Sequence, residues 1–176
     1  MNTQKTFKMP LRMQKYVSHR RINKDKQQKR IRKITQRGTR TCKNNRSTFS
    51  IILADLDLFK MINDTYGHLM GDKVLKEVSF ILSSQLRSSD SLARWGGEEF
   101  VILLPNTHLK EAILIAERLR KAVNIKIEPI TKPISISFGV TQYVEEDTTD
   151  SVLSRVDKAL YKAKTRGRNR VEVEEA

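Results

Sequence analysis

Hydrophobic residues along positions 48–173 recur with two different spacings. Short runs that are continuously apolar, or that alternate apolar with polar residues, predict β-strands, whereas apolar residues three or four positions apart predict amphipathic helices. The predicted strands are Thr48–Leu56, Leu92–Trp95, Phe100–Leu104, Pro133–Tyr143 and a last edge strand at Val171–Val173. The predicted helices are a short one at Phe59–Asp64 and longer ones at Gly71–Arg87, Thr107–Val123 and Asp150–Arg166.

The order of these elements predicts the fold class. They follow one another as strand, helix, two strands, helix, strand and helix. This order is typical of an α/β (α+β) sandwich, in which helices pack over a mixed, mainly antiparallel sheet. Gly96 and Gly97 lie between the second and third strands, where a hairpin would turn. The pattern therefore predicts one layered domain over residues 47–176.

Charge divides the chain into two parts. Residues 1–46 hold 16 Lys and Arg residues and one acid, Asp25, for a net charge of +15. Residues 47–176 hold 18 Lys and Arg residues and 19 Asp and Glu residues, for a net charge of −1. The overall net charge of +14 thus belongs to the N-terminal segment, and the remainder is a nearly neutral globular domain.

The basic arm, residues 1–46, has little hydrophobic periodicity, and three interpretations of it stay open. It is a solvated, partly disordered arm, a segment that binds nucleic acid or an anionic membrane surface, or an eroded start of the domain. The arm has no interleaved aromatic residues and no recognisable nucleic-acid motif, which favours the first interpretation.

Features that would direct the chain out of the cytosol are missing from the sequence. No apolar run approaches the roughly 18–20 residues that cross a bilayer, and no apolar stretch follows the basic N-terminus as in a secretory signal. The single cysteine, Cys42, cannot form an internal disulfide. We therefore expect a cytoplasmic protein.

Acidic residues gather at the ends of predicted neighbouring strands. Asp55 and Asp57 end the first strand, and Glu98 and Glu99 lie on the glycine hairpin. Carboxylates without Cys or clustered His suit Mg²⁺ or Mn²⁺ rather than zinc. Two glycines would also let a bulky ligand approach the hairpin backbone. The alternative for the hairpin alone is an ordinary solvated turn with acidic tips.

A second polar cluster lies between the first strand and the following helix. A carboxylate and an amide, such as those of Asp72 and Asn63, can pair with the Watson–Crick edge of guanine, and Lys60 is available for phosphate. Turn and helix-cap duty is the alternative for Asn63 and Asp72, since both lie near glycines. His68, taken alone, is more often structural than functional.

A third cluster ends the last predicted helix. Lys164 and Arg168 lie one helical turn apart and could reach a triphosphate together. The alternative is helix C-capping, because basic side chains favour the C-terminal end of a helix dipole and Gly167 is a natural stop.

Together these segments resemble a known family. The runs Asp55–Asp72, Arg94–Phe100 (RWGGEEF), Ser135–Val140 (SISFGV) and Asp157–Asn169 (DKALYKAKTRGRN) are similar, in that order, to the motifs of the GGDEF family of diguanylate cyclases. The resemblance covers about residues 48–172. It implies a fold like that of polymerase palms and class III nucleotidyl cyclases.

The resemblance assigns expected roles to the acids. Asp55 and Glu98 would hold Mg²⁺ or Mn²⁺, with help from the backbone carbonyl of Leu56. Glu98 or Glu99 would help to deprotonate the attacking 3′-hydroxyl. Glu98 stands where the family name has Asp, a variant that active members also use.

It likewise assigns the nucleotide contacts. Asn63 and Asp72 would bind guanine, with His68 nearby. The residues that would face the phosphates are Lys60, Lys164 and Arg168.

An RxxD motif just before the hairpin adds an expected regulatory site. Arg87 and Asp90 match the position at which the family binds its own product, and Arg118 is a candidate to complete that site from a partner subunit. A surface ion pair at a helix end, worth little in stability, is the alternative for Arg87 and Asp90.

The implied reaction joins two GTP molecules into cyclic di-GMP and releases two pyrophosphates, with homodimerisation because one domain presents one GTP site. The alternative function is a weak or inactive domain that senses GTP or cyclic di-GMP. One departure from the family favours that alternative. The family's opening motif, DxLTGLxNRR, corresponds here to residues 13–21, of which only His19-Arg20-Arg21 is similar.

Overall fold

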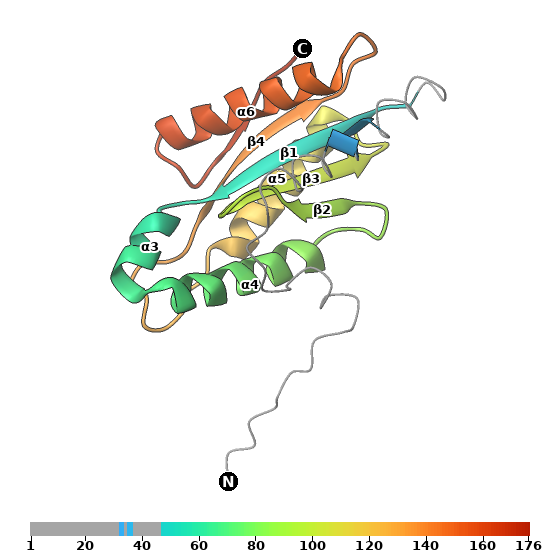
Figure 1. The fold of residues 1–176 in the computed structure, drawn as a ribbon. Helices are drawn as coiled ribbons and strands as arrows, with labels where there is room; N and C mark the ends of the chain where they lie inside the picture. The colour runs from blue at the N-terminus through green and yellow to red at the C-terminus, as the bar shows by residue number, and fades with distance from the viewer. Residues whose placement is uncertain (1–31, 34, 37–46) are drawn as a thin grey trace.

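The computed structural model describes residues 32–33, 35–36 and 47–176, and Figure 1 shows the layered domain that the last range forms. The strands are β1 (Phe49–Leu56), β2 (Ser91–Arg94), β3 (Glu99–Pro105), β4 (Ile136–Gln142) and β5 (Val171–Val173). The helices of this range are α3 (Phe59–Tyr66), α4 (His68–Ser84), α5 (Leu109–Val123) and α6 (Thr149–Thr165). The opening motif at 13–21, Cys42 and most of the basic arm lie outside the described residues.

The strands form one sheet in the order β2-β3-β1-β4-β5. Neighbouring strands are antiparallel except β4 and β5, which are parallel. The predicted mixed, mainly antiparallel sheet is therefore confirmed, including the hairpin between β2 and β3. Strand β1 is the central strand and is buried along its whole length.

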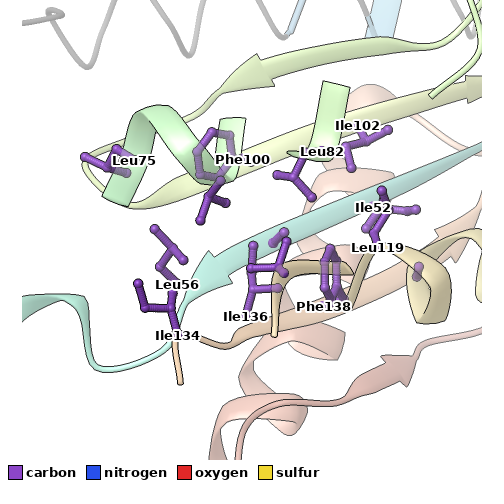
Figure 2. Close-up of a cluster of buried hydrophobic side chains, with 14 of the residues drawn as sticks. Ile52, Leu56, Leu75, Leu82, Phe100, Ile102, Leu119, Ile134, Ile136 and Phe138 are labelled. Atoms are coloured by element: carbon purple, nitrogen blue, oxygen red, sulfur yellow. The ribbon is translucent and has the colours of Figure 1, made fainter. Parts of the chain in front are cut away.

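Residues of β1 alternate between two hydrophobic cores, as the two faces of a strand require. Ile52, Ala54 and Leu56 face a core that α4 and α5 cover, and Figure 2 shows its side chains meeting between the sheet and these helices. Phe49, Ile51 and Leu53 face a second core, which α6 covers. The helices thus lie on both faces of the sheet (Figure 1). Asp55, two residues beyond Leu53, continues the row on the α6 side.

Helix α6 lies directly against β4. A Cβ atom added to Gly139 would come within 2.3 Å of the Leu160 backbone nitrogen and 2.5 Å of the Val156 carbonyl oxygen. No larger residue fits there without displacing the helix, so the glycine of the SISFGV motif sets the distance between α6 and the sheet.

The predicted starts of α4 and β4 each differ from the structure by three residues. Helix α4 begins at His68, before the predicted Gly71, because Gly67 at φ 81° ends α3 and lets α4 start at the next residue. Strand β4 begins at Ile136 rather than Pro133, since Ile134 instead forms an isolated bridge with Ile125.

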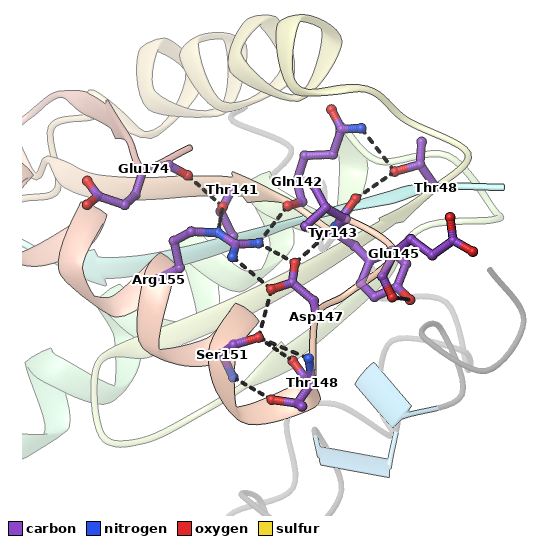
Figure 3. A network of polar contacts seen from close by, with 11 residues as sticks. Thr48, Thr141, Gln142, Tyr143, Glu145, Asp147, Thr148, Ser151, Arg155 and Glu174 are labelled. Carbon is purple, nitrogen blue, oxygen red and sulfur yellow. Dashed lines mark hydrogen bonds and ion pairs between the residues drawn. The ribbon is translucent and has the colours of Figure 1, made fainter. Parts of the chain in front are cut away.

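A buried ion pair fixes the N-terminal end of α6 (Figure 3). Asp147 accepts hydrogen bonds from Arg155 Nη1 at 2.8 Å, from Ser151 Oγ at 2.7 Å and from the Val144 backbone N–H at 2.9 Å. Arg155 also donates to Thr141 Oγ1 and to the Gln142 carbonyl, so the pair ties α6 to the end of β4. Burial by itself raises the pKa of Asp147, but the hydrogen bonds from Arg155, Val144 and Ser151 outweigh it and lower the pKa.

The structure describes only a small part of the basic arm. Arg32 forms an ion pair with Asp150 of α6 at 3.3 Å, and Thr35 is fully buried. None of the helices in the described part of the chain has the length and hydropathy needed to cross a membrane.

Asp147→Asn should lower the free energy of unfolding by about 3–5 kcal/mol at neutral pH, because it leaves the Arg155 charge buried without its counterion. A lowered pKa in the folded state gives stability that is present above the unfolded pKa and is lost as pH falls through the folded value. The difference in free energy of unfolding between wild type and variant should therefore narrow below about pH 4. Urea unfolding at neutral pH and below about pH 4 measures this difference. Glu146→Gln, at the exposed neighbouring position, should change little, and equal stability of Asp147→Asn and wild type at pH 7 would contradict the structural role.

Candidate functional site

Asp55 lies where β1 ends, between two other strands. It is paired with Glu99 of β3 on one side and Ser137 of β4 on the other. Only 5% of the Asp55 surface is exposed to solvent. Its side chain belongs to the face that α6 covers, and Lys164 Nζ, from the last turn of α6, lies 2.6 Å from Asp55 Oδ2. The structure therefore brings together two residues that the sequence separates by more than 100 positions.

The surroundings of Asp55 disfavour its negative charge. Burial raises the pKa of Asp55 to about 6, and the like charges of Glu98 and Glu99 also raise it, while the hydrogen bond and the charge of Lys164 act in the opposite direction. A cation that reaches Asp55 would relieve both the burial and the repulsion. In the structure the cation beside Asp55 is the ammonium of Lys164.

Arg94 shapes the glycine hairpin. Its Nε donates to the carbonyls of Gly96 at 3.1 Å and Gly97 at 2.9 Å, so the guanidinium closes the turn from inside. Burial lowers the pKa of Arg94, and the opposing charges of Asp72 and Glu98 raise it. Arg94 thus binds the hairpin backbone and also interacts electrostatically with Asp72 at the start of α4. The sequence did not reveal that one residue contacts both segments.

The hairpin backbone holds its two acids against β1. The Leu56 backbone N–H donates to the Glu98 carbonyl at 3.2 Å. A Cβ atom on Gly96 would lie 2.5 Å from Glu99 Oε2, so a larger residue there would displace that carboxylate. These contacts place Glu98 and Glu99 beside the end of β1.

Asn63 and Asp72 come from the α3–α4 segment. The Asn63 side chain lies over Gly71, where an added Cβ would meet Asn63 Oδ1 at 2.0 Å. Gly71 therefore makes the space that Asn63 occupies, and Asp72 follows it directly on α4. Lys60 and His68 lie on α3 and at the start of α4, and their side chains are exposed.

The turn after α6 carries Arg168. Gly167, Arg168 and Asn169 have φ values of 115°, 63° and 45°, and the Arg168 backbone N–H donates to the Ala163 carbonyl at 3.0 Å. Figure 1 shows this turn and α3 at the same end of the sheet as the end of β1. Acids, basic residues and the α3–α4 segment thus gather at one end of the sheet.

The chemistry of the donors fits a hard divalent cation. Asp55 and Glu98 supply carboxylates next to the Leu56 backbone, and all of these ligands are oxygen atoms. Within the described residues no three His, Cys, Asp or Glu side chains stand close enough to form a ready-made metal centre. The arrangement matches the way Mg²⁺ is usually held, by one or two carboxylates together with substrate phosphates.

Asp57 has a different environment from Asp55. Its carboxylate accepts hydrogen bonds from Ser135 Oγ at 2.7 Å, from Ser137 Oγ at 2.6 Å and from the Asn169 backbone N–H at 3.0 Å. The sequence placed both aspartates at one strand end, and only the family resemblance gave Asp55 a role that Asp57 lacked.

The RxxD motif lies between α4 and β2, away from the acids at the end of β1. The Arg87 backbone N–H donates to Asp90 Oδ2 at 2.9 Å, and Arg87 Nη2 lies 2.9 Å from Glu111 Oε1 of α5. Arg118 lies about two helical turns after Glu111 on α5. Its Nη2 donates to the Gln85 carbonyl at 2.8 Å. Arg118 and Glu111 of α5 therefore both contact the segment that carries the RxxD motif.

Comparisons with known proteins identify the family of this chain. The family model described as "Diguanylate cyclase, GGDEF domain" matches residues 22–170, a range that begins inside the basic arm. The chain is 46% identical over 130 residues to Diguanylate cyclase A of Treponema denticola, covering 72% of this chain and 35% of that protein. It is 45% identical over 124 residues to Diguanylate cyclase DgcM of Escherichia coli, covering 70% of this chain and 30% of that protein. The chain thus spans about a third of the length of these curated relatives.

Solved structures share the fold. The active GGEEF domain of a diguanylate cyclase from Vibrio cholerae superposes with a TM-score of 0.75 at 35% identity, covering 80% of this chain and 91% of that one. The GGDEF domain of DgcB from Caulobacter crescentus, in complex with c-di-GMP, gives a TM-score of 0.77 at 29% identity, covering 82% and 86%. The sequence-predicted fold class is therefore confirmed.

Asp55→Asn should not destabilise the protein in the absence of metal, because it removes a charge that burial disfavours. A pKa raised in the folded state gives stability that is present below the unfolded pKa and is lost as pH rises through about 6. The melting temperature of the variant in EDTA should therefore equal or exceed that of wild type, most clearly above pH 7. Asp157→Asn, on the exposed side of α6, serves as the control. A lower melting temperature for Asp55→Asn at pH 7.5 would mean that the Lys164 contact is mainly structural.

Proposed function

The chain belongs to the GGDEF family of diguanylate cyclase domains, and from that premise we propose that it joins two GTP molecules into cyclic di-GMP and releases two pyrophosphates. The observation that carries the proposal is the buried Asp55, which lies between the hairpin acids and Lys164. A site for a metal–triphosphate needs carboxylates for the metal and cations for the phosphates at the same place. The c-di-GMP bound to the related DgcB domain supports the assignment of the product.

Asn63 and Asp72 bind the guanine base. A carboxylate that accepts from the ring N1–H and the exocyclic amine selects guanine over adenine, whose N1 carries no proton. The carboxylate of Asp72 is exposed and free to turn towards a base, and Gly71 keeps Asn63 beside it. His68 lies one turn earlier on α4 and would be near the base.

Lys164, Arg168 and Lys60 bind the triphosphate. Lys164 already reaches the acids at the end of β1, and Arg168 follows it on the next turn of the chain. A guanidinium can bind two phosphate oxygens at once, and an ammonium adds a point charge. Lys164 leaves Asp55 for a phosphate oxygen when a metal-bound nucleotide enters.

Asp55, Glu98 and the Leu56 carbonyl would hold Mg²⁺ or Mn²⁺, which when bound neutralises triphosphate charge and makes the 3′-hydroxyl more acidic. Glu98 or Glu99 accepts the proton from that hydroxyl as its oxygen attacks the α-phosphorus of the second GTP. The bond to pyrophosphate breaks as the new phosphodiester bond forms. No covalent intermediate with the protein is needed.

Two copies of the domain take part in each reaction. The described residues of one chain supply one set of acids and one set of guanine-binding residues, which serves one GTP. Two domains that face each other bring the 3′-hydroxyl of each nucleotide to the α-phosphorus of the other. We therefore propose a homodimer as the active form.

The RxxD motif serves as a product-binding site that inhibits the enzyme. Arg87 is exposed, and its only recorded ionic partner among the described residues is the similarly exposed Glu111, a pair that costs little to separate. Arg118 binds the Gln85 carbonyl of the same chain, two residues before Arg87, and is the candidate to complete this site.

Glu98→Gln should lower the rate of cyclic di-GMP formation by ~10²–10⁴-fold, because the amide keeps the shape of the side chain but neither binds a metal as a carboxylate nor accepts the proton. The measurement is chromatography of the products after incubation with GTP and Mg²⁺. Glu77→Gln, an exposed acid on α4, is the control and should match wild type. Wild-type protein that binds GTP yet forms no cyclic di-GMP at high concentration would favour the alternative, a sensing domain.

Arg87→Ala should weaken cyclic di-GMP binding by about tenfold or more, since a charged hydrogen bond to phosphate is worth roughly 1.5–3 kcal/mol. The initial rate at low product should stay within about twofold of wild type. Calorimetry gives the affinity, and progress curves with added product give the inhibition. Lys121→Ala is the control, because Lys121 is another exposed basic residue but lies on α5. Equal product affinity in wild type and Arg87→Ala would remove this site from consideration.

A further inference from the structure

Asp57 accepts more hydrogen bonds than the other acids near the site. The proposed reaction gives it no part in binding or catalysis. Ser135 precedes β4, Ser137 lies within β4, and Asn169 belongs to the turn between α6 and β5. All three donate to the Asp57 carboxylate. One buried side chain at the end of β1 therefore joins three segments that are far apart in the sequence.

The turn that Asp57 holds has an unfavourable backbone. Arg168 and Asn169 both have positive φ, a conformation that Asn adopts more readily than most residues but that is costly for Arg168 unless surrounding contacts impose it. The Asn169 N–H donates to Asp57 Oδ2 and to Ser137 Oγ, while Asn169 Oδ1 accepts from Arg120 at 2.9 Å. These contacts act together with the bond from the Arg168 N–H to the Ala163 carbonyl to hold the turn in this shape.

The same contacts leave Asp57 less able to bind a metal than the acids proposed as metal ligands. Oδ1 accepts from Ser137 at 2.6 Å, and Oδ2 accepts from Ser135 at 2.7 Å and from Asn169 at 3.0 Å. A metal ion on either oxygen would have to replace hydrogen bonds that hold the turn. Asp55 instead has the single cation Lys164 as its recorded partner in the described structure.

We propose that Asp57 is a positioning residue for the triphosphate: by binding the backbone of Asn169 it fixes the turn so that Arg168 and the end of α6 face the end of β1. The proposal rests on the proposed binding of GTP at this end of the sheet. Asp57 touches neither nucleotide nor metal, and it acts on affinity through Arg168. Because the turn is already held in one conformation, its backbone loses less conformational entropy when Arg168 binds phosphate.

Asp57→Asn is the informative substitution, because it keeps the size of the side chain. The amide has one acceptor oxygen, and its NH₂ group, if it faces Asn169, meets another donor. Affinity for a GTP analogue with an α,β-methylene bridge is measured by calorimetry with Mg²⁺. We expect at least about tenfold weaker binding. Asp147→Asn, a buried aspartate at the other end of α6, is the control for stability loss alone and should keep wild-type affinity.

A double-mutant cycle distinguishes action through Arg168 from a separate contribution. Arg168→Ala should weaken binding of the analogue, and adding Asp57→Asn to Arg168→Ala should weaken it little further. Mn²⁺ binding without nucleotide, followed by electron paramagnetic resonance, should be the same in Asp57→Asn and wild type. Unchanged affinity for the analogue, fully additive effects, or loss of Mn²⁺ binding in Asp57→Asn would each overturn the proposal.

Amide hydrogen exchange tests the turn independently of nucleotide. The Asn169 amide should exchange at least about tenfold faster in Asp57→Asn than in wild type, while amides of β1 keep their protection. Unchanged exchange at Asn169 would overturn the positioning role even if affinity falls. If wild type does not bind the analogue but Asn169 exchange still rises in the variant, the proposed function fails while the structural tie between Asp57 and the turn holds.

Discussion

The complete burial of β1 is the constraint on which the rest of the domain depends. This strand lies in the middle of the sheet and is covered by α4 and α5 on one face and by α6 on the other. Polar groups at its end must therefore find partners or bear the cost of burial. Asp57 finds three hydrogen-bond donors, whereas burial and two neighbouring acids raise the pKa of Asp55 against the opposing effect of Lys164. Two aspartates two positions apart thus differ in chemistry: one is satisfied and structural, and the other is poised for a cation.

Helix α6 connects that constraint to the proposed phosphate site. Its start is held by the Asp147–Arg155 pair, its middle lies against Gly139, and its end is tied through Asn169 to Asp57. Lys164, in the last turn of α6, and Arg168, in the turn that follows, therefore project from the end that Asp57 holds. Long basic side chains lose much conformational entropy when they bind phosphate, and a rigid support limits the further loss from ordering the backbone.

Much of the fold could be predicted because hydrophobic periodicity reflects burial directly: every strand and helix of residues 47–176 was expected, with boundaries that shifted by a few residues. The site was harder. Clusters around Asp55, Glu98 and Lys164 were recognisable as motifs, yet their convergence depends on strand pairing and on packing of α6, which local patterns do not encode. Arg94 and Asp57 act through contacts with residues remote in sequence or with backbone atoms, so no spacing rule could have found them.

The central claim is that the acids of β1 and the hairpin, the guanine-binding segment and the end of α6 form a single metal–nucleotide site. A crystal structure with Mn²⁺ and the α,β-methylene analogue of GTP tests it most directly, because manganese is located by its anomalous signal. We expect the anomalous peak between Asp55 and Glu98, guanine against Asn63 and Asp72, and phosphate oxygens on Lys164 and Arg168. A metal peak away from Asp55, or an analogue bound elsewhere on the domain, would contradict the claim.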